Sequence, residues 1–238
     1  MKFERGPFAA VIALVVIAAL GFLGVRAFNR GVHDYIVGHP EVLLEAQAAY
    51  ARKQDEAMAT RAKAVIRARQ AEIFADARDP FVGPRDARVS VVQFFDYRCP
   101  HCKAEAAPAV EALIRKYPNV KFIFKEWPIF GGPSQTAARA ALGAWREGRY
   151  LPVYVALMAD RDVTPETIDQ ALRGAGLDPG KTLADAASPE IARQLADVQS
   201  LAMALGADGT PAFIVGDTMV PGARMDQVEA LIRKGLKG

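Results

Sequence analysis

Residues 94–103 read FFDYRCPHCK, and this stretch decides which fold the chain is expected to adopt. It begins inside a run of β-branched and aromatic residues, 89–95, whose nearly continuous apolar character is typical of a buried central strand. A helical pattern follows over residues 100–116, and a second strand pattern covers residues 120–126. The stretch therefore predicts a strand–helix–strand unit with two cysteines where its first strand meets its helix.

The two cysteines stand where a helix begins, and this position favours redox chemistry. A helix N-terminus presents unpaired N–H groups and a partial positive charge, so it should stabilise a thiolate on Cys99 and lower its pKa. Protonated His101 adds to this effect, and Pro100 suits the first helical position, where no N–H group is needed. A stabilised thiolate favours the reduced pair and makes the disulfide an oxidant. We expect Cys99 to exchange with substrate and the more buried Cys102 to resolve the mixed disulfide.

Other uses of a cysteine pair can be weighed against this one. A structural zinc site needs about four ligands, but the other histidines, His33 and His39, precede the predicted folded domain. We therefore expect no metal site and no cofactor. A structural disulfide closing so short a ring would gain little from loop entropy. Copper(I) capture by the soft thiolates of Cys99 and Cys102, in a module for metal tolerance, is the alternative function from another class.

The N-terminus is expected to direct the chain out of the cytoplasm. Residues 8–25 contain no charged side chain, and at about 1.5 Å per residue a helix of this length nearly crosses a bilayer core. Lys2 and Arg5 precede it, as the positive-inside rule favours. Residues 1–27 are therefore either a signal peptide, cut near residues 25–27, or an inner-membrane anchor. Both alternatives place the rest of the chain in the periplasm or another extracytoplasmic space, where disulfides persist.

Residues 28–79 have the pattern of a helical arm. Pro40 suits a first helical position, and neither Gly nor Pro interrupts the Ala-rich sequence between it and Pro80. The pattern therefore predicts one helix from Pro40 to Phe74. Large apolar residues concentrate within residues 32–50, which we interpret as an oligomerisation region followed by a charged arm. An amphipathic helix folded back on its own domain is the alternative.

The remaining sequence completes an α/β pattern. Residues 134–206 are helical throughout, strand patterns return at 212–215 and 217–220, and a last helix covers 225–234. Helix breaks are expected at Gly148, residues 160–164, residues 174–176 and Ser188-Pro189. The formal charge of +3, with no block of like charge, gives no support to nucleic-acid binding.

Three segments together resemble one known family. FFDYRCPHC at 94–102, KEWPIFGG at 125–132 and GTPAFIVG at 209–216 are similar to the DsbA-like branch of the thioredoxin superfamily, over residues 80–238. The resemblance implies a thioredoxin fold with a helical insertion at about 134–206. It also implies a cis peptide between Thr210 and Pro211 beside the cysteines, where a substrate segment would pair as an added strand.

The resemblance also carries implications for partners and proton transfer. It implies unfolded or misoxidised exported proteins as substrates, and a membrane redox partner that resets the cysteines. Residues 32–79 are similar in pattern to oligomeric ScsC-like members, which implies a trimer with isomerase activity; dithiol oxidation and isomerisation both stay open. Gln93 stands where some family oxidases have a buried acidic residue. Lys125 and Glu126 are candidates for its role in proton transfer, with a plain ion pair as the alternative.

Overall fold

The computed structural model describes residues 6–238, so Lys2 and Arg5, the basic residues expected before the apolar segment, lie outside the described part. Contacts divide the chain into two compact units, one ending at Glu56 and the other running from Ala57 to Gly238. The organisation suggested by the sequence stays a prediction: residues 1–27, 28–79 and 80–238.

The first unit contains helix α1, Gly6–Gly38, and the beginning of α2, Glu41–Ala68. His39 and Pro40 separate the helices because proline lacks an N–H group and disfavours helical dihedral angles at the preceding residue. Within α1, Leu14–Gly38 is long and apolar enough to cross a membrane, the one such helix in the described part of the chain. A signal sequence passes the same test, so this segment fits both roles expected of the N-terminus.

The second unit is built on a mixed five-stranded sheet with the order β1-β3-β2-β4-β5. The central strands β2 and β3 are parallel, as a strand–helix–strand unit requires, and every other neighbouring pair is antiparallel. The short strand β1 was not predicted, because a strand of two residues is too short to show an alternating pattern of apolar and polar side chains. The strands are β1 Phe81–Val82, β2 Ser90–Phe95, β3 Lys121–Glu126, β4 Ala212–Val215 and β5 Thr218–Pro221.

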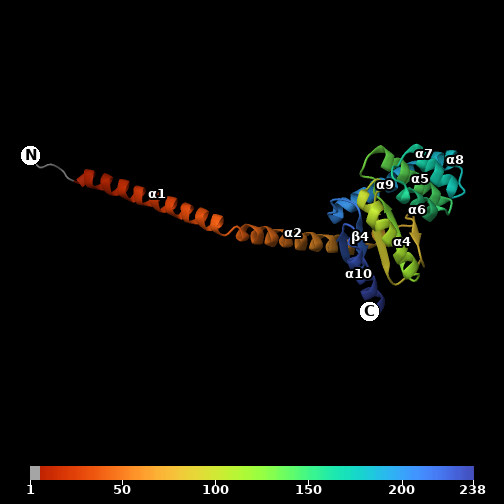
Figure 1. The fold of residues 1–238 in the computed structure, drawn as a ribbon, viewed down its shortest axis with the longest axis horizontal. Coiled ribbons are helices and arrows are strands. Elements are labelled where there is room, and N and C mark those ends of the chain that lie inside the picture. Colours follow the sequence, from red (N-terminus) through yellow and green to blue (C-terminus); the bar gives the residue numbers. More distant parts are fainter. Residues whose placement is uncertain (1–5) are drawn as a thin grey trace, which may run out of the picture. The chain divides into compact units, whose positions relative to one another are not determined.

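Helices cover both faces of this sheet, and the predicted α/β class is confirmed. The insertion helices α5 to α8 gather at one end of the unit, coloured green to teal in Figure 1. The predicted breaks in the insertion are also confirmed, and Thr164 caps α7 through a reciprocal pair of hydrogen bonds with Thr167. The helices are α3 Gln70–Phe74, the π-helical turn η1 Cys102–Ala106, α4 Ala107–Lys116, α5 Gly132–Arg146, α6 Tyr150–Ala159, α7 Pro165–Gly174, α8 Pro179–Ala186, α9 Pro189–Leu205 and α10 Met225–Lys237.

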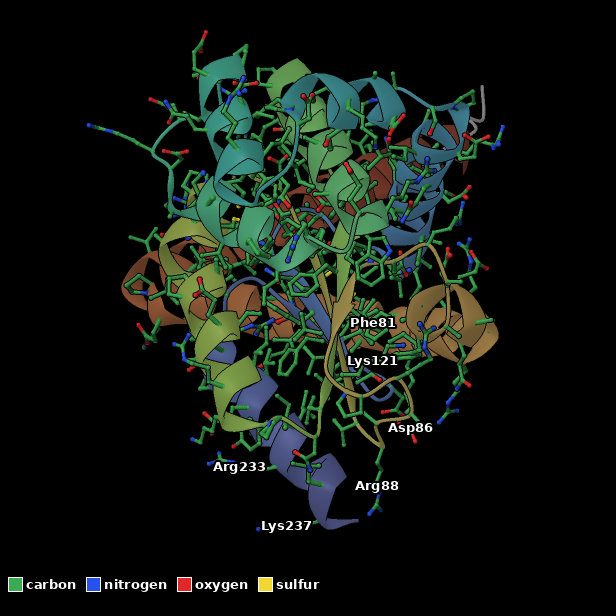
Figure 2. All side chains as sticks on the ribbon, turned by 90° about the vertical axis from the view of Figure 1, so that its right-hand side faces the viewer. Phe81, Asp86, Arg88, Lys121, Arg233 and Lys237 are labelled. Carbon is green, nitrogen blue, oxygen red and sulfur yellow. The ribbon has the colours of Figure 1, made fainter. Side chains whose placement is uncertain are left out.

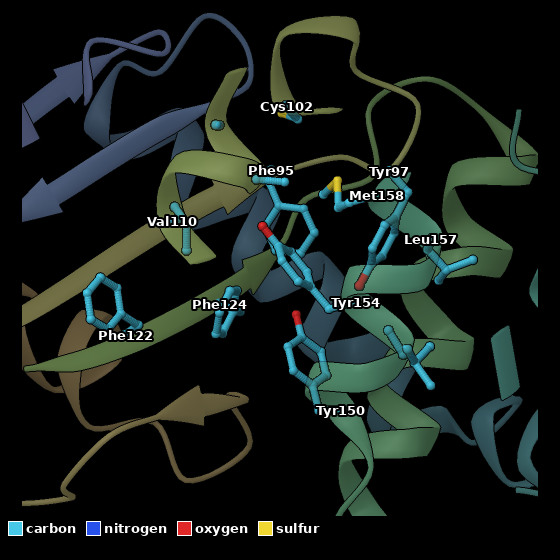
Figure 3. Packing of buried hydrophobic residues seen from close by; sticks show 14 of the residues in the cluster. Phe95, Tyr97, Cys102, Val110, Phe122, Phe124, Tyr150, Tyr154, Leu157 and Met158 are labelled. Atoms are coloured by element: carbon cyan, nitrogen blue, oxygen red, sulfur yellow. The ribbon is translucent and has the colours of Figure 1, made fainter. Parts of the chain in front are cut away.

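Strand alternation sends side chains from β2 and β3 into two separate cores. On one face, Phe95 and Phe124 pack in a cluster with η1, α4, α6 and α10, which includes Cys102. Figure 3 shows Cys102 above Phe95, with Tyr154 of α6 beside the Phe95 ring and Tyr150 below it. On the other face, Val92 and Ile123 pack with α9 and the C-terminal part of α2. The cysteine pair therefore belongs to the core beneath the insertion.

The predicted single helix from Pro40 to Phe74 is wrong in one respect, because it is interrupted at Arg69. Arg69 has φ −120° and ψ 32°, outside the helical region, so the chain turns before α3. Ile66 before the turn and Ile73 after it are both buried in the second core. No Gly or Pro marks this break; beyond it, the carbonyls of Glu72 and Phe74 accept hydrogen bonds from Lys125 and Lys121 of the sheet.

Two lysines of β3 hold the chain segment between α3 and β1. Lys125 is buried on the second face, where its Nζ donates to the Asp79 carboxylate and, over 2.5 Å, to the Glu72 carbonyl. Lys121 Nζ lies 4.8 Å from the centroid of the Phe81 ring, and Figure 2 shows these two residues next to each other. These contacts place residues 72–81 against the sheet.

Candidate active site

The end of β2 places Cys99 at the opening of a helix, as predicted. The Cys99 N–H donates to the Asp96 carbonyl over 3.2 Å, and the Lys103 N–H donates to the Cys99 carbonyl over 3.1 Å. Both cysteines are free thiols. Cys99 is 2% exposed and Cys102 is fully buried. Because Arg98 and Pro100 on either side of Cys99 are exposed, Cys99 lies directly beneath the surface.

The Cys99 sulfur takes part in two hydrogen bonds. Its Sγ accepts from the Cys102 N–H over 3.3 Å, and the protonated thiol donates to the Thr210 carbonyl over 3.1 Å. Hydrogen bonding by Cys102, and then by Thr210 and the backbone N–H groups of Cys102 and His101, lowers the pKa of Cys99 to about 6. This is the depressed pKa expected at a helix N-terminus.

Cys102 has the opposite environment. Burial, and then its hydrogen bond with Cys99, raises the pKa of Cys102 far above that of an ordinary thiol. The two cysteines therefore differ in the way that a two-step exchange needs, since the reactive thiolate forms on Cys99 alone.

His101 is exposed beside the pair. Its Nδ1 lies 2.7 Å from Glu105 Oε1, and this carboxylate raises the pKa of His101. The imidazolium form is thus retained to a higher pH than in a free histidine, next to the Cys99 thiolate. The neighbouring Pro100 is exposed and precedes η1.

A titration should detect the depressed thiol pKa. We expect the thiolate absorbance of the reduced protein near 240 nm to rise with a midpoint at about pH 6, well below the ordinary value of about 8.5. Because the folded pKa of Cys99 is lowered, the thiolate stabilises the reduced protein above the unfolded pKa, and this contribution is lost as the pH falls through about 6. The oxidised protein is the control, and a midpoint above pH 8 would contradict the assignment.

The structure brings Thr210 and Pro211 to the cysteines, as the resemblance implied. The peptide bond between them is cis, and Thr210 supplies the carbonyl next to Cys99 Sγ. This proximity follows from strand pairing, because Ala212 at the start of β4 lies opposite Phe94 near the end of β2. Residues more than a hundred positions apart thus meet at one end of the sheet.

The two candidates for proton transfer point to opposite faces of β3. Lys125 is paired with Asp79 in the second core, away from the cysteines. Glu126 is buried on the face of β3 that bears the first core, and burial raises its pKa well above the ordinary value. The alternation of side chains along a strand makes this separation unavoidable. Of the two, only Glu126 remains a candidate.

Three buried tyrosines that the sequence did not single out surround Glu126 and Gln93. Glu126 Oε1 accepts hydrogen bonds from the hydroxyl groups of Tyr97 (2.9 Å) and Tyr150 (2.8 Å), while Tyr154 donates to Gln93 Oε1 over 3.3 Å. Figure 3 shows Tyr97 and Tyr154 beside Phe95, and Tyr150 below them, farther from Cys102. Tyr150 and Tyr154, four residues apart and so on one face of a helix, were the available signal, but this segment was predicted only to be helical.

Within residues 6–238 no group of three or more His, Cys, Asp or Glu side chains could hold a metal ion. His33 and His39 have only local acidic partners, Asp34 and Glu41. Copper(I) capture by the two thiols stays the alternative hypothesis.

A free Cys-x-x-Cys pair at a strand–helix junction, with one depressed and one raised pKa, defines a thiol–disulfide oxidoreductase. Residues 90–233 match the family described as DSBA-like thioredoxin domain, and the chain belongs to this family. The predicted thioredoxin fold is therefore confirmed. Residues 25–57 match the N-terminal domain of the copper resistance protein ScsC, which confirms the ScsC-like resemblance of the preceding region.

Solved structures and curated relatives agree with this family. A thioredoxin-like oxidoreductase from Silicibacter pomeroyi is 36% identical, with a TM-score of 0.67 over 71% of this chain and 98% of that one. BcfH from Salmonella enterica Typhimurium is 29% identical, with a TM-score of 0.72 over 96% of this chain and 99% of that one.

Among curated proteins, disulfide bond formation protein D of Bacillus subtilis is 27% identical over 172 residues, 67% of this chain and 78% of that protein. The Na(+)/H(+) antiporter NhaA 3 of Salinispora tropica is 30% identical over 141 residues, 58% of this chain. The match spans only 22% of that antiporter's length.

Proposed function

We propose that the chain exchanges disulfides with exported proteins through Cys99 and Cys102. The observation that carries the proposal is the opposite pKa shift of the two thiols, which makes Cys99 the nucleophile and keeps Cys102 protonated until it is needed. Pro100 and His101 complete the helix opening, and Thr210 and Pro211 form the adjacent substrate edge.

The exchange balances in two steps. The Cys99 thiolate attacks one sulfur of a substrate disulfide, which forms a mixed disulfide and releases the other substrate sulfur as a thiolate. Cys102 then gives up its proton and attacks the Cys99 sulfur, so that the protein is oxidised to the Cys99–Cys102 disulfide and the substrate leaves as a dithiol. Dithiol oxidation is the same sequence in reverse, and isomerisation returns the electrons to a different pair of substrate sulfurs.

The N-terminal helix supports action outside the cytoplasm, because Leu14–Gly38 suits a signal sequence or an anchor. A structural relative from Salmonella enterica is described as a periplasmic thioredoxin-like protein, at 34% identity. We place this chain in the periplasm, where a membrane redox partner resets the cysteine pair and exported proteins present their thiols.

The proposal also includes an oligomeric form of the protein with isomerase activity. Large apolar side chains that the described chain leaves exposed occur within the predicted oligomerisation region, 32–50: Val32, Tyr35, Val37, Leu43, Leu44 and Tyr50. Such side chains are expected to be buried between copies of the chain. The ScsC-like match over 25–57 supports a trimer, in which several thiol pairs surround one misoxidised substrate.

Trapping of the mixed disulfide tests the proposed function. The Cys102→Ala variant keeps the nucleophile but removes the group that releases the substrate, so we expect it to accumulate disulfide-linked complexes with exported proteins on non-reducing gels. The Cys99→Ala/Cys102→Ala variant is the control and should form none. Complexes in the double variant, or their absence from the single variant, would argue against Cys99 as the exchanging thiol.

A further inference from the structure

Asp96 lies in the turn that follows β2, and its carboxylate is buried, with 2% of the residue exposed. Oδ1 accepts hydrogen bonds from the Arg98 N–H (2.6 Å) and the Ser134 hydroxyl (2.7 Å). Oδ2 accepts from the backbone N–H groups of Ile129 (2.7 Å) and Phe130 (3.0 Å). All four partners are donors, so both carboxylate oxygens are fully used.

These bonds join three separate pieces of the chain. They connect the turn before Cys99, the loop of residues 127–131 that follows β3, and the first turn of α5. Two further hydrogen bonds run in parallel with them, from Arg98 Nη1 to the Phe130 carbonyl (2.7 Å) and from the Trp127 N–H to the Phe95 carbonyl (3.0 Å). The loop is therefore attached to the cysteine turn at several points and not by one contact.

The loop presents apolar side chains next to this attachment. Ile129 is 40% exposed and Phe130 is 44% exposed, although their backbone N–H groups are held by Asp96. A substrate sulfur must reach Cys99 Sγ, so the substrate chain that carries it has to pass over the residues beside the cysteine turn. A loop fixed there keeps the same position relative to Cys99 Sγ, whichever substrate approaches.

We propose that Asp96 is a positioning residue, which fixes the loop of residues 127–131 to the Cys99 turn so that polypeptide disulfides meet a preformed contact surface. The inference rests on the proposed function and concerns the binding of polypeptide substrates. The Asp96 carboxylate does not act on the Cys99 thiol itself, because the groups hydrogen-bonded to Cys99 Sγ belong to Cys102 and Thr210.

An amide cannot replace this carboxylate, although it has the same shape. Asparagine offers one oxygen with two lone pairs and an NH₂ group that only donates. If the NH₂ group faces the Ile129 and Phe130 N–H groups, both of those hydrogen bonds are lost. If it faces Arg98 and Ser134 instead, the Arg98 bond is lost and the Ser134 hydroxyl must turn to become an acceptor. The Asp96→Asn variant should therefore release either the loop or the cysteine turn while leaving the fold intact.

The test compares two disulfides with the full-length chain: insulin as the polypeptide, reduced catalytically with dithiothreitol regenerating the thiols, and glutathione disulfide as the small molecule, followed in a single turnover of the reduced protein. For Asp96→Asn we expect the KM for insulin to rise about tenfold with kcat changed less than about twofold. The rate with glutathione disulfide should stay within about twofold of the unaltered chain. The matched control is Asp86→Asn, since Asp86 is exposed at the opposite end of the sheet (Figure 2).

A second variant keeps the test independent of folding. Phe130→Ser changes an exposed side chain, and we expect the same rise in KM for insulin without loss of secondary structure. An unchanged KM in either folded variant would overturn the inference, as would an equal loss with both disulfides. Neither result would affect the proposed function, which fails only if exchange no longer depends on Cys99.

Discussion

Replacing Cys99 by serine is expected to reduce disulfide exchange by roughly a thousandfold or more, because it removes the nucleophile that the rest of the site serves. A hydroxyl group cannot take the place of the thiolate, whose pKa the surrounding hydrogen bonds lower to about 6. Cys102 cannot substitute for it, since burial holds its pKa far above neutrality. The loss should be the same in both directions of exchange.

Two assays measure this loss and separate the two proposed activities. Oxidation of reduced ribonuclease reports dithiol oxidation, and reactivation of scrambled ribonuclease by the reduced protein reports isomerisation. The unaltered chain shows which activity dominates, while Cys99→Ser should abolish both. His101→Ala is the comparison variant, because it leaves the nucleophile in place and should retain much of the activity. Full exchange by the Cys99→Ser variant would rule out the proposed mechanism.

The Lys125→Met variant is expected to lose about 3–5 kcal/mol in free energy of unfolding. Lys125 and Asp79 are both buried, and methionine would leave the Asp79 carboxylate without its charged partner. Burial already raises the pKa of Asp79 to about 6, and Lys125 opposes that shift. Without Lys125 the pKa of Asp79 should rise further, so the folded protein keeps a proton that the unfolded chain has released.

The pH dependence of this loss can be stated in advance. An acid whose folded pKa is raised loses stability as the pH rises from its unfolded value through its folded value. The destabilisation by Lys125→Met should therefore be larger at pH 7 than at pH 5, as measured by urea unfolding. The Asp79→Leu/Lys125→Met variant should recover most of the loss, because no charge is then buried. Lys234→Met, at an exposed position, is the control; an effect of Lys125→Met no larger than this control would refute the prediction.

Several features of the site were accessible from the local sequence because they depend on period and spacing alone. The run before Cys99 is almost continuously apolar, as a buried strand is, so β2 and the helix opening could be placed within about one residue. The roles of Thr210 and Pro211 came from resemblance only. Nothing local to those two residues indicates that they meet Cys99.

Other features required the folded chain. The break at Arg69 has no Gly or Pro, so propensity could not predict it, whereas the folded chain shows the carbonyls of the following segment accepting from Lys121 and Lys125 of the sheet. Lys125 and Glu126 are adjacent in sequence and were considered together. The strand places one against Asp79 and the other on the opposite face, that of the first core.

The sequence by itself determined the secondary structure around the cysteine pair, the chemistry of that pair and the apolar N-terminal segment, because each is encoded in neighbouring residues. Only the tertiary structure decided which distant groups surround the thiols. Three of the four donors on Asp96, the tyrosines of α6 around Glu126 and the carbonyl of Thr210 come from segments brought together by sheet register and helix packing. Such long-range contacts leave no periodic trace in the chain, since each depends on the relative placement of whole elements.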